Sequence, residues 1–289
     1  IFITFFLSII FTRSIIRPIK ILSSLVKIEQ DKLNPSDNIL AYPIRNDEIG
    51  SLSDDIKNML KALKLRINEL EKFASDVSHE LKNPLSSLKT SNELLAGDKI
   101  KSEDKKLLFN NIIKDLDRMN GLISSISEYT RTQVEMEKQK FDEFELIEFI
   151  NDLKLLFAQN NKKIKILFDT NDSEIIIQAN IDKLAQVFIN LIENAISFSP
   201  QQSNILIQQV RKDDRVIIYI ADQGCGITEK SKDKIFERFY TDRLDKNYYH
   251  VGLGLSISKK IIENFNGSLD LCDKLIEGYN GACFKLELP

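Results

Sequence analysis

Residues 215–228, RVIIYIADQGCGIT, join an apolar run to an aspartate and two glycines. The run is rich in β-branched residues, which favours a strand, and the glycines after Asp222 favour a loop. Similar runs at 163–170, 174–179 and 204–210 are mixed with helical patterns at 145–159, 181–196 and 253–265. Strands mixed with helices predict a two-layer α/β sandwich from about residue 143, with a hairpin turn at Asp213-Asp214.

Polar residues suited to a nucleotide accompany these elements. Asp222 ends its strand and can accept a hydrogen bond from an adenine amino group. Asn190 and Asn194 lie one helical turn apart, so their amide oxygens can reach one hard cation such as Mg²⁺. GLGLSI, at 252–257, opens the last predicted helix, whose N–H groups and positive end favour phosphates. A single glycine cluster would more often mark only a turn.

Two long helical patterns precede the sandwich, at 68–96 and 103–135. The second carries apolar residues at four-three steps from Ile112 to Ile126. The short stretch AGDKIKS between them contains a glycine breaker, so we expect the helices to be antiparallel neighbours. Because two such helices bury little apolar surface as a pair, we expect a dimeric four-helix bundle.

The first residues, IFITFFLSIIF at 1–11, suit a membrane. A hydrocarbon core needs roughly 20 apolar residues, so we expect this stretch to be the end of a longer membrane helix that is truncated here. Arg13, Arg17 and Lys20 follow, and positive charge marks the cytoplasmic end of such a helix. The chain is therefore expected to enter the cytosol near Thr12. A signal-peptide core and a buried strand are the alternatives.

Two coiled-coil seams follow the apolar stretch. The first begins at Ile15 and includes Pro18, and a polar connector with two prolines occupies 29–46. The second begins at Ile49 and contains two successive four-residue steps around Leu63, a stutter that locally changes coiled-coil winding. On periodicity alone, a signal relay module and a plain coiled-coil stalk fit equally well.

The stretch SDVSHELKNP, residues 75–84, holds one of the two histidines of the chain. On a helix, His79 lies roughly 165° from the middle of the apolar side. That side consists of Val77, Leu81, Leu85 and Leu88. We therefore expect the imidazole of His79 to face solvent.

Three neighbours give the exposed histidine a chemical setting. Asn83 shares its face, and Glu80 lies close enough to hydrogen-bond one ring nitrogen and leave the other free as a nucleophile. Pro84 is expected to bend the helix just beyond. An exposed histidine beside a carboxylate can also be an accident of a solvated face. A metal site is not expected, because no second histidine or cysteine is near.

The composition limits the remaining classes of protein. The chain has 289 residues, 43% of them hydrophobic, which suits two or three folded domains. A formal net charge of −3 gives no bulk attraction for nucleic acid. Cys225, Cys272 and Cys283 are scattered and odd in number, so we expect no disulfide framework and no zinc cluster. A reducing cytosol and burial as small apolar residues suit them.

Five stretches, in this order, resemble the phosphoacceptor, N, G1, F and G2 boxes of the sensor histidine kinases of two-component systems. They are SDVSHELKNPL (75–85), NLIENAISFSP (190–200), DQGCGIT (222–228), FERFY (236–240) and GLGLSI (252–257). The resemblance covers essentially the whole chain. It implies a multidomain fold: an all-α coiled-coil and four-helix-bundle dimerisation part, followed by an α/β two-layer sandwich of the Bergerat (GHKL) type shared with gyrase, Hsp90 and MutL.

The resemblance also implies domain boundaries. They are the end of a transmembrane helix at 1–12, a HAMP-like signal relay at 13–66, a dimerisation and histidine phosphotransfer hairpin at 67–135, a linker at 136–142 and a catalytic ATP-binding domain at 143–289.

Residue roles follow from the same resemblance. His79 would accept the γ-phosphoryl group, Glu80 would orient it and accept its proton, and Asn83 would position water for a phosphatase reaction. Asn194 would bind Mg²⁺, with Asn190 beside it as a possible second ligand. The remaining ATP-binding residues would be Asp222 at the adenine, Gly224 and Gly226 in its loop, Gly252, Gly254 and Leu255 at the phosphate-side helix, and Arg243 in a lid at 241–251.

Two residues depart from the family pattern. Relatives that hydrolyse ATP carry a glutamate where Asn190 stands, and an amide cannot act as a base for water, which favours transfer to His79. Ser197 stands where many members have a lysine that meets the phosphates, and Arg243 or a neighbouring basic residue is the candidate to supply that charge.

The implied protein is a homodimeric sensor kinase of the bacterial inner membrane, cytoplasmic from about residue 13. It would use ATP and Mg²⁺ to phosphorylate His79, pass the group to a response-regulator aspartate, and contact no nucleic acid directly. Two alternatives from other classes remain. A GHKL ATPase or serine kinase leaves the exposed face of His79 without a role, and a catalytically inactive dimeric scaffold would not bind ATP.

Overall fold

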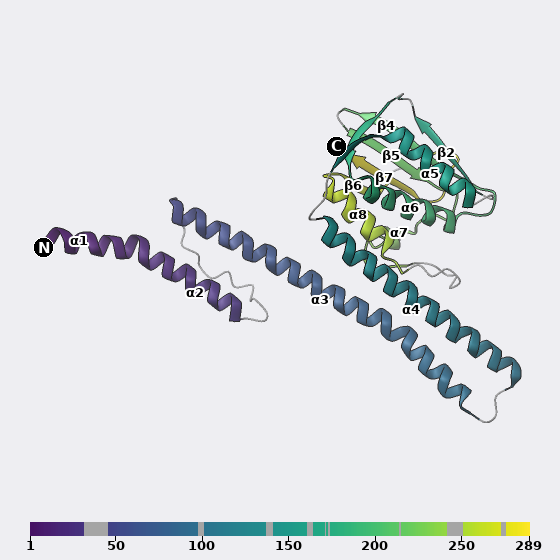
Figure 1. The fold of residues 1–289 in the computed structure, drawn as a ribbon, viewed down its shortest axis with the longest axis horizontal. Coiled ribbons are helices and arrows are strands. Elements are labelled where there is room, and N and C mark those ends of the chain that lie inside the picture. The colour runs from purple at the N-terminus through teal and green to yellow at the C-terminus, as the bar shows by residue number, and fades with distance from the viewer. Residues whose placement is uncertain are drawn as a thin grey trace. The chain divides into compact units, whose positions relative to one another are not determined.

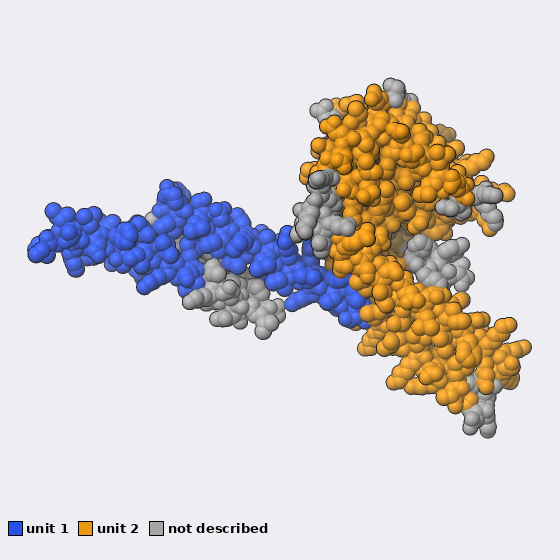
Figure 2. All heavy atoms as spheres, viewed as in Figure 1, with its two compact units in different colours: residues 1–78 blue, residues 79–289 orange. Residues whose placement is uncertain are grey.

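Figure 1 shows the fold in a computed structural model of the chain. The structure describes residues 1–31, 46–97, 101–136, 141–160, 164–170, 172, 174–213, 215–241, 251–272 and 276–289. The chain divides into two compact units, residues 1–78 and residues 79–289 (Figure 2). Helix α3, Glu48–Leu95, contributes to both.

Apart from Ile1 and the bend at 46–47, the described residues of the first unit are helical. Helix α1, Phe2–Phe11, passes through a π-helical turn at Thr12–Ile16 into α2, Arg17–Asp31. The helical run is thus longer than the apolar stretch, and Pro18 is the second residue of α2. Every side chain of residues 1–11 is exposed. Most of the connector expected at 29–46 lies outside the described residues.

One candidate membrane span, Phe2–Ser24, is 23 residues long and apolar enough to cross a bilayer. Core helices of soluble proteins and signal sequences meet the same criterion, so length and apolarity do not by themselves place it in a membrane. The complete exposure of residues 1–11 argues against a core helix, because such a helix buries at least one face.

Helix α3 begins where Asp47 accepts a hydrogen bond from the backbone N–H of Gly50, at 3.1 Å. Its predicted seam is largely uncovered within one chain. The exposed seam residues are Leu52, Met59, Leu63, Ile67 and Leu70. An apolar stripe of this length, at coiled-coil spacing, is what a helical partner would cover.

The second unit opens with a helical hairpin made of the end of α3 and of α4, Ser102–Met136. Helix α3 continues through Pro84, and the bend expected there stays a prediction. Leu85 is 59% exposed, although the helical projection placed it on the buried side. The hairpin alone offers only two helices, so it cannot cover that side from every direction; the predicted four-helix bundle would.

The rest of the second unit is the predicted two-layer α/β sandwich. Its strands are β1 (Asp142–Glu145), β2 (Lys165–Thr170), β3 (Ile176–Ala179), β4 (Asn204–Lys212), β5 (Arg215–Ala221), β6 (Ser268–Leu271) and β7 (Cys283–Leu288). Five form one sheet in the order β2-β4-β5-β7-β6, and β1 pairs with β3. Only β2 and β4 are parallel; the other neighbours are antiparallel.

Three helices form the second layer: α5 (Leu146–Asn160), α6 (Ile181–Phe198) and α8 (Gly254–Asn264). Along the chain, the single helical turn α7, Glu229–Lys232, comes between β5 and α8. Helix α6 is central because it contacts α8 and both middle strands β4 and β5. Its side chain cap is Asn180, which accepts a hydrogen bond from the N–H of Lys183 at 3.0 Å.

The buried face of α6 explains where its asparagines point. Its fully buried apolar side chains recur at three- and four-residue steps: Leu184, Val187, Phe188, Leu191, Ile192 and Ala195. This face packs on the sheet, as the helical period requires. Asn190 and Asn194 lie beside it, at the edge where α8 begins.

Three strands escaped the sequence prediction: β1, β6 and β7. The first two have four residues each, which is too short for a reliable period. In β7, CFKLEL, Lys285 and Glu287 alternate with buried apolar residues. The hairpin between β4 and β5 was predicted correctly; Asp213 adopts φ 54°, and Asp214 lies outside the described residues.

The expectation that the cysteines form no disulfide is wrong. Cys272 and Cys283 are joined by a disulfide, with their Cα atoms 5.4 Å apart. They are separated by 11 positions in sequence, and the antiparallel β6–β7 pairing brings the chain back on itself. The sequence could not show this because β6 and β7 were not recognised. Cys225 is free and exposed.

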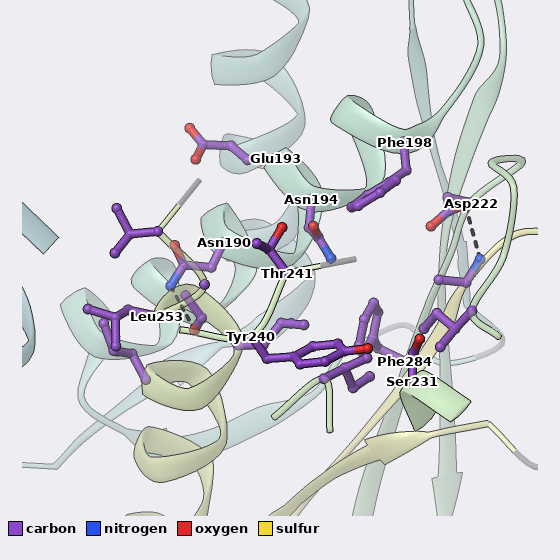
Figure 3. A pocket seen from close by; sticks show the side chains of 18 of the residues that line it. Asn190, Glu193, Asn194, Phe198, Asp222, Ser231, Tyr240, Thr241, Leu253 and Phe284 are labelled. Atoms are coloured by element: carbon purple, nitrogen blue, oxygen red, sulfur yellow. Dashed lines mark hydrogen bonds between the residues drawn. The ribbon is translucent and has the colours of Figure 1, made fainter. Parts of the chain in front are cut away.

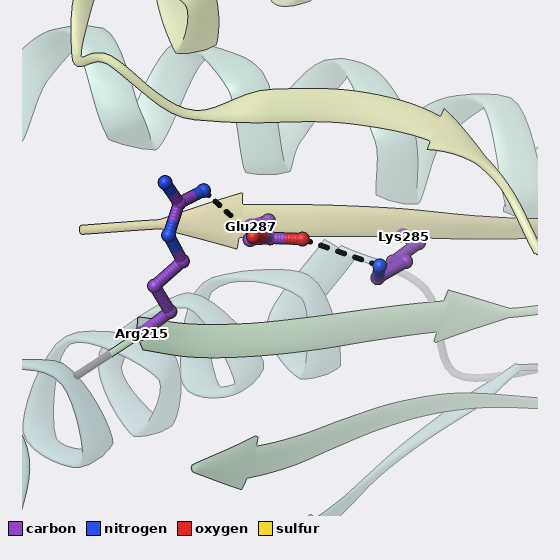
Figure 4. A network of polar contacts seen from close by, with 3 residues as sticks. All are labelled: Arg215, Lys285 and Glu287. Atoms are coloured by element: carbon purple, nitrogen blue, oxygen red, sulfur yellow. Dashed lines mark hydrogen bonds and ion pairs between the residues drawn. The ribbon is translucent and has the colours of Figure 1, made fainter. Parts of the chain in front are cut away.

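Glu287 joins two basic side chains on the surface of the sheet (Figure 4). It accepts a hydrogen bond from Arg215 at 2.7 Å and pairs with Lys285 at 3.2 Å. The hydrogen bond from Arg215, followed by that from Lys285, lowers the pKa of Glu287 below its ordinary 4.5. The unfolded chain therefore binds more protons at acid pH, so this contribution to stability is complete above pH 4.5 and is lost as pH falls through the lower folded-state pKa.

We predict that Glu287→Gln lowers the free energy of unfolding by about 0.5–1 kcal/mol at neutral pH, the usual range for an exposed ion pair. The difference should shrink at acid pH, because Glu287 of the wild type is then protonated. Denaturant unfolding of the wild type and of Glu287→Gln, at neutral pH and at an acid pH below the folded-state pKa of Glu287, measures this difference in the free energy of unfolding. Glu277→Gln, at an exposed glutamate that makes no ion pair among the described residues, serves as control. A loss of equal size at both pH values would contradict the assignment.

Candidate functional site

A cavity of about 580 Å³ opens between α6, the start of α8 and the loop after β5 (Figure 3). Phe198, Ile235 and Phe284 supply apolar walls, and Asn194 and Asp222 supply polar groups. An apolar cavity with a few polar groups fixed in place is the usual form of a small-ligand site. Helix α4 also reaches it, through Ser125 and Glu128.

Asp222 is held in place by the backbone of two segments of the cavity wall. Its side chain accepts hydrogen bonds from the N–H of Gly224 at 2.8 Å and of Ala282 at 3.1 Å. The residue is 3% exposed. Burial raises the pKa of Asp222, and the two backbone hydrogen bonds oppose that rise. One oxygen is thus fixed by the backbone, which orients the carboxylate toward the cavity.

Gly281 permits this arrangement, and sequence reasoning missed it. Its N–H donates to the backbone oxygen of Asp222 at 3.0 Å. A Cβ at position 281 would overlap the side-chain oxygen of Asp222 and the backbone nitrogen of Gly224. Only glycine allows the two segments to approach this closely. The signal available in the sequence is the stretch GYNGA, residues 278–282, in which two glycines mark a tight turn.

The asparagine pair lies where the sequence predicted. Asn190 and Asn194 both line the cavity, one turn apart on α6. The amide nitrogen of Asn190 donates to the carbonyl oxygen of Gly254 and to the hydroxyl of Ser258, both at 3.4 Å. Because a carbonyl oxygen can only accept, this contact orients the amide with its nitrogen toward α8. Ser197, which was expected to depart from the family pattern, donates to the carbonyl oxygen of Asn194 at 2.8 Å.

The glycines before α8 bring that helix to the cavity. Gly252 has φ 76°, and a Cβ there would lie 2.6 Å from the carbonyl oxygen of Tyr240. A side chain is therefore excluded both by conformation and by space. Gly254 and Leu255, the first residues of α8, line the cavity together with Gly226. The unpaired N–H groups at the start of α8 thus face the place where an anion would bind.

Not every predicted residue can be placed. Arg243 and most of the expected lid lie outside the described residues. Thr241 and Val251, at the two ends of that segment, both line the cavity. The expectation that Arg243 supplies the charge absent at Ser197 therefore stays a prediction.

A pair of acidic side chains was not foreseen. Glu193 of α6 and Glu128 of α4 both line the cavity. Burial, together with the charge of Glu128, raises the pKa of Glu193. Gln186 donates to Glu128 at 2.7 Å, so α4 is hydrogen-bonded to α6 at this point. Helical projection cannot find such a pair, because the two residues belong to different helices.

His79 is exposed on α3, as predicted, and Asn83 is exposed one turn further on. Glu80 is partly buried, and its carboxylate accepts a hydrogen bond from Arg118 of α4 at 3.0 Å. The expected hydrogen bond between Glu80 and the ring of His79 is not among those of the described residues. Arg118 was missed because its partner lies 38 positions away on the other helix.

Comparisons with known proteins agree with both parts of this geometry. Residues 69–135 match the family model described as the His Kinase A (phospho-acceptor) domain. Residues 179–289 match the model described as the histidine kinase-, DNA gyrase B-, and HSP90-like ATPase. The segment matched by the first model includes His79, and the segment matched by the second includes Asn190, Asn194 and Asp222. The chain belongs to the sensor histidine kinase family.

Curated relatives of this sensor histidine kinase are described as sensor proteins or as sensor histidine kinases. It is 36% identical to the sensor protein ChvG of Rhizobium meliloti, over 98% of this chain and 51% of that protein. It is 31% identical to the sensor histidine kinase YclK of Bacillus subtilis, over 84% of this chain and 53% of that protein. The chain therefore spans about half the length of the curated relatives it matches.

A solved structure of the family has a similar fold. It is the histidine kinase ThkA in complex with the response regulator protein TrrA, at a TM-score of 0.58 and 28% identity. The match covers 78% of this chain and 63% of that one. The helical hairpin followed by the α/β sandwich is thus an arrangement that a solved histidine kinase shares.

Proposed function

We propose that this chain is an ATP-dependent protein-histidine kinase that phosphorylates itself on His79 and passes the phosphoryl group to an aspartate of a response regulator. The observation that carries the proposal is the cavity that joins Asp222, Asn194 and the start of α8, in a chain that exposes His79 beside a partly buried carboxylate. A phosphoryl donor site and a nucleophile are the two parts that such a reaction needs.

ATP fits the cavity at both ends. Asp222 offers its second carboxylate oxygen to the amino group of adenine, and the N–H groups at the start of α8 face the phosphates. Mg²⁺ prefers oxygen ligands and is usually bound by one or two protein groups together with substrate phosphates. Asn194, with Asn190 as a possible second ligand, supplies amide oxygens of the right kind. The metal would neutralise charge on the transferring group.

The transfer itself needs little covalent chemistry from the protein. A ring nitrogen of His79 attacks the γ-phosphorus, and the bond to the bridging oxygen breaks, so that ADP leaves with the electron pair. Glu80 accepts the proton from the other ring nitrogen, and Arg118 holds its carboxylate in place. Asn190 stands where hydrolytic relatives have a glutamate, which favours this transfer over hydrolysis.

The test is incubation of the protein with γ-labelled ATP and Mg²⁺, followed by treatment with acid and with alkali. A phosphohistidine loses its label in acid and retains it in alkali, whereas a phosphoserine does the reverse. We expect acid-labile, alkali-stable label that moves to an added response regulator. Acid-stable label would instead support a serine kinase, and absence of nucleotide binding would support an inactive scaffold.

We also propose that the chain acts as a membrane-anchored homodimer with a HAMP-like relay at residues 13–66. The exposed residues 1–11 suit the bilayer, and Arg13, Arg17 and Lys20 suit its cytoplasmic side. The uncovered seam of α3 supports a dimer, since a second copy would bury it. Asn83 is the candidate to position water for dephosphorylation of the regulator.

The stutter around Leu63 is the predicted switch between the kinase activity and the phosphatase activity. We predict that substitutions that restore a strict heptad there change the ratio of kinase to phosphatase activity by about fivefold or more. A change of this size corresponds to the lower end of typical coupling free energies. Matched substitutions at exposed polar positions outside the seam, such as Lys61, should leave the ratio within twofold. Equal ratios across the whole set would contradict a signalling role for the stutter.

A further inference from the structure

The disulfide Cys272–Cys283 lies directly behind the residues that hold Asp222. Cys283 pairs with Ala221 in the β5–β7 ladder. Ala221 directly precedes Asp222 in the chain. Ala282, the neighbour of Cys283, donates to the Asp222 side chain and accepts from the Asp222 N–H at 2.9 Å. Ala282, whose N–H holds this carboxylate, is therefore the residue next to one cysteine of the disulfide.

The surroundings of the disulfide are compact on one side and open on the other. Cys283 is 3% exposed and packs in a small apolar cluster with Leu206 and Ala221. Cys272 and Tyr279 are only partly buried against that cluster. Cys272 is therefore the more exposed of the two cysteines and the one that an attacking thiolate would approach, whereas Cys283 is buried. Disulfides of cytosolic proteins are usually transient or redox-sensing, which fits a bond with one accessible sulfur.

We propose that Cys272 and Cys283 form a thiol–disulfide modification site whose oxidised form holds Asp222 ready for adenine and whose reduced form binds nucleotide more weakly. The site deepens the proposed function, since it rests on Asp222 as the adenine-reading group. The physical reason is space. Two unbonded thiols need more room than a bonded pair of sulfurs, and because Cys283 is packed inside the buried cluster, its thiol would gain that room by displacing the start of β7 next to Ala282.

The chemistry requires a reductant, which is a dithiol or a pair of small-molecule thiols. One thiolate attacks the sulfur of Cys272 and forms a mixed disulfide, and the bond to Cys283 breaks with release of its thiolate, which takes up a proton. A second thiolate attacks the mixed disulfide and releases Cys272 as a thiol. Two electrons pass from the reductant to the protein, and the reductant becomes a disulfide. Glutathione disulfide reverses the sequence.

The experiment compares ADP binding by the full chain in detergent micelles, oxidised with glutathione disulfide or reduced with dithiothreitol. Alkylation of free thiols followed by mass measurement defines each state. Because Cys225 is free, the oxidised protein should carry one added group at that residue, alkyl or glutathione, and the reduced protein should carry three alkyl groups. Calorimetric titration with ADP and Mg²⁺ should then give a dissociation constant at least about threefold higher after reduction, as expected when fewer molecules hold the competent conformation.

Variants separate this site from the third cysteine. Cys272→Ser should bind ADP with one affinity in both redox conditions, close to that of the reduced wild type. Cys225→Ser should keep the difference between the two states. Three alkyl groups after oxidation, or equal ADP affinities in two chemically defined states, would overturn the proposal. Failure of both states to bind ADP would overturn the nucleotide site itself, which is a different result because the alkyl counts would still differ.

Discussion

We expect His79→Gln to abolish acid-labile labelling of the chain by γ-labelled ATP, to below about one-hundredth of the wild-type level. The amide nitrogen of glutamine has a delocalised lone pair and cannot replace a ring nitrogen as nucleophile. His79 is exposed on α3, so the substitution removes no buried contact and should leave the helix intact. Nucleotide binding should be unchanged, because the cavity contains no atom of residue 79.

The matched control is His250→Gln, at the other histidine of the chain. This variant should still acquire acid-labile label. Parallel titration with ADP distinguishes loss of the phosphoacceptor from loss of the donor site. Acid-labile label that persists in His79→Gln would assign the phosphoacceptor to another residue.

Gly281→Ala should weaken nucleotide binding by about 10- to 150-fold. The added methyl group cannot coexist with the Asp222 carboxylate and the Gly224 nitrogen in their present positions, so the carboxylate must move. A hydrogen bond to a charged group contributes about 1.5–3 kcal/mol, which corresponds to that range of affinity. Titration with ADP and Mg²⁺ measures it.

Two further variants show whether the effect belongs to the site. Asp222→Asn preserves the size of the side chain and should weaken ADP binding by a similar factor. Gly121→Ala lies on α4, where a Cβ would meet nothing within 4 Å in the chain, and should bind ADP like the wild type. Thermal unfolding establishes that each variant is folded. Wild-type affinity in a folded Gly281→Ala protein would show that the close approach to Asp222 does not matter.

The elements that carry the site were predictable because their signals are local. Helix α6 has a strong apolar period, which fixed both its extent and the shared face of Asn190 and Asn194. The same arithmetic placed His79 on the exposed side of α3. The glycines near 224 and 252 were recognisable because their backbone requirement belongs to the residue itself. The resemblance to the histidine kinases then assigned chemical roles that periodicity could not supply.

The elements of the fold that the sequence did not predict were mainly short strands and strands with alternating charged residues. Strand β6 has four residues, and β7 places charges between its apolar positions, so neither gives a distinctive pattern. Missing them hid the disulfide, because Cys272 and Cys283 meet only when those strands pair.

By itself, the sequence determined the helical and α/β parts of the chain, the exposed histidine, the asparagine pair and the glycines of the cavity. Only the tertiary structure decided that Arg118 holds Glu80, that Gly281 lies against Asp222, and that two cysteines form a bond. The physical reason is the same in each case. A periodic pattern reports what one residue and its near neighbours require of their own backbone. A contact between distant segments depends on strand register and on helix pairing, which no short stretch of sequence contains.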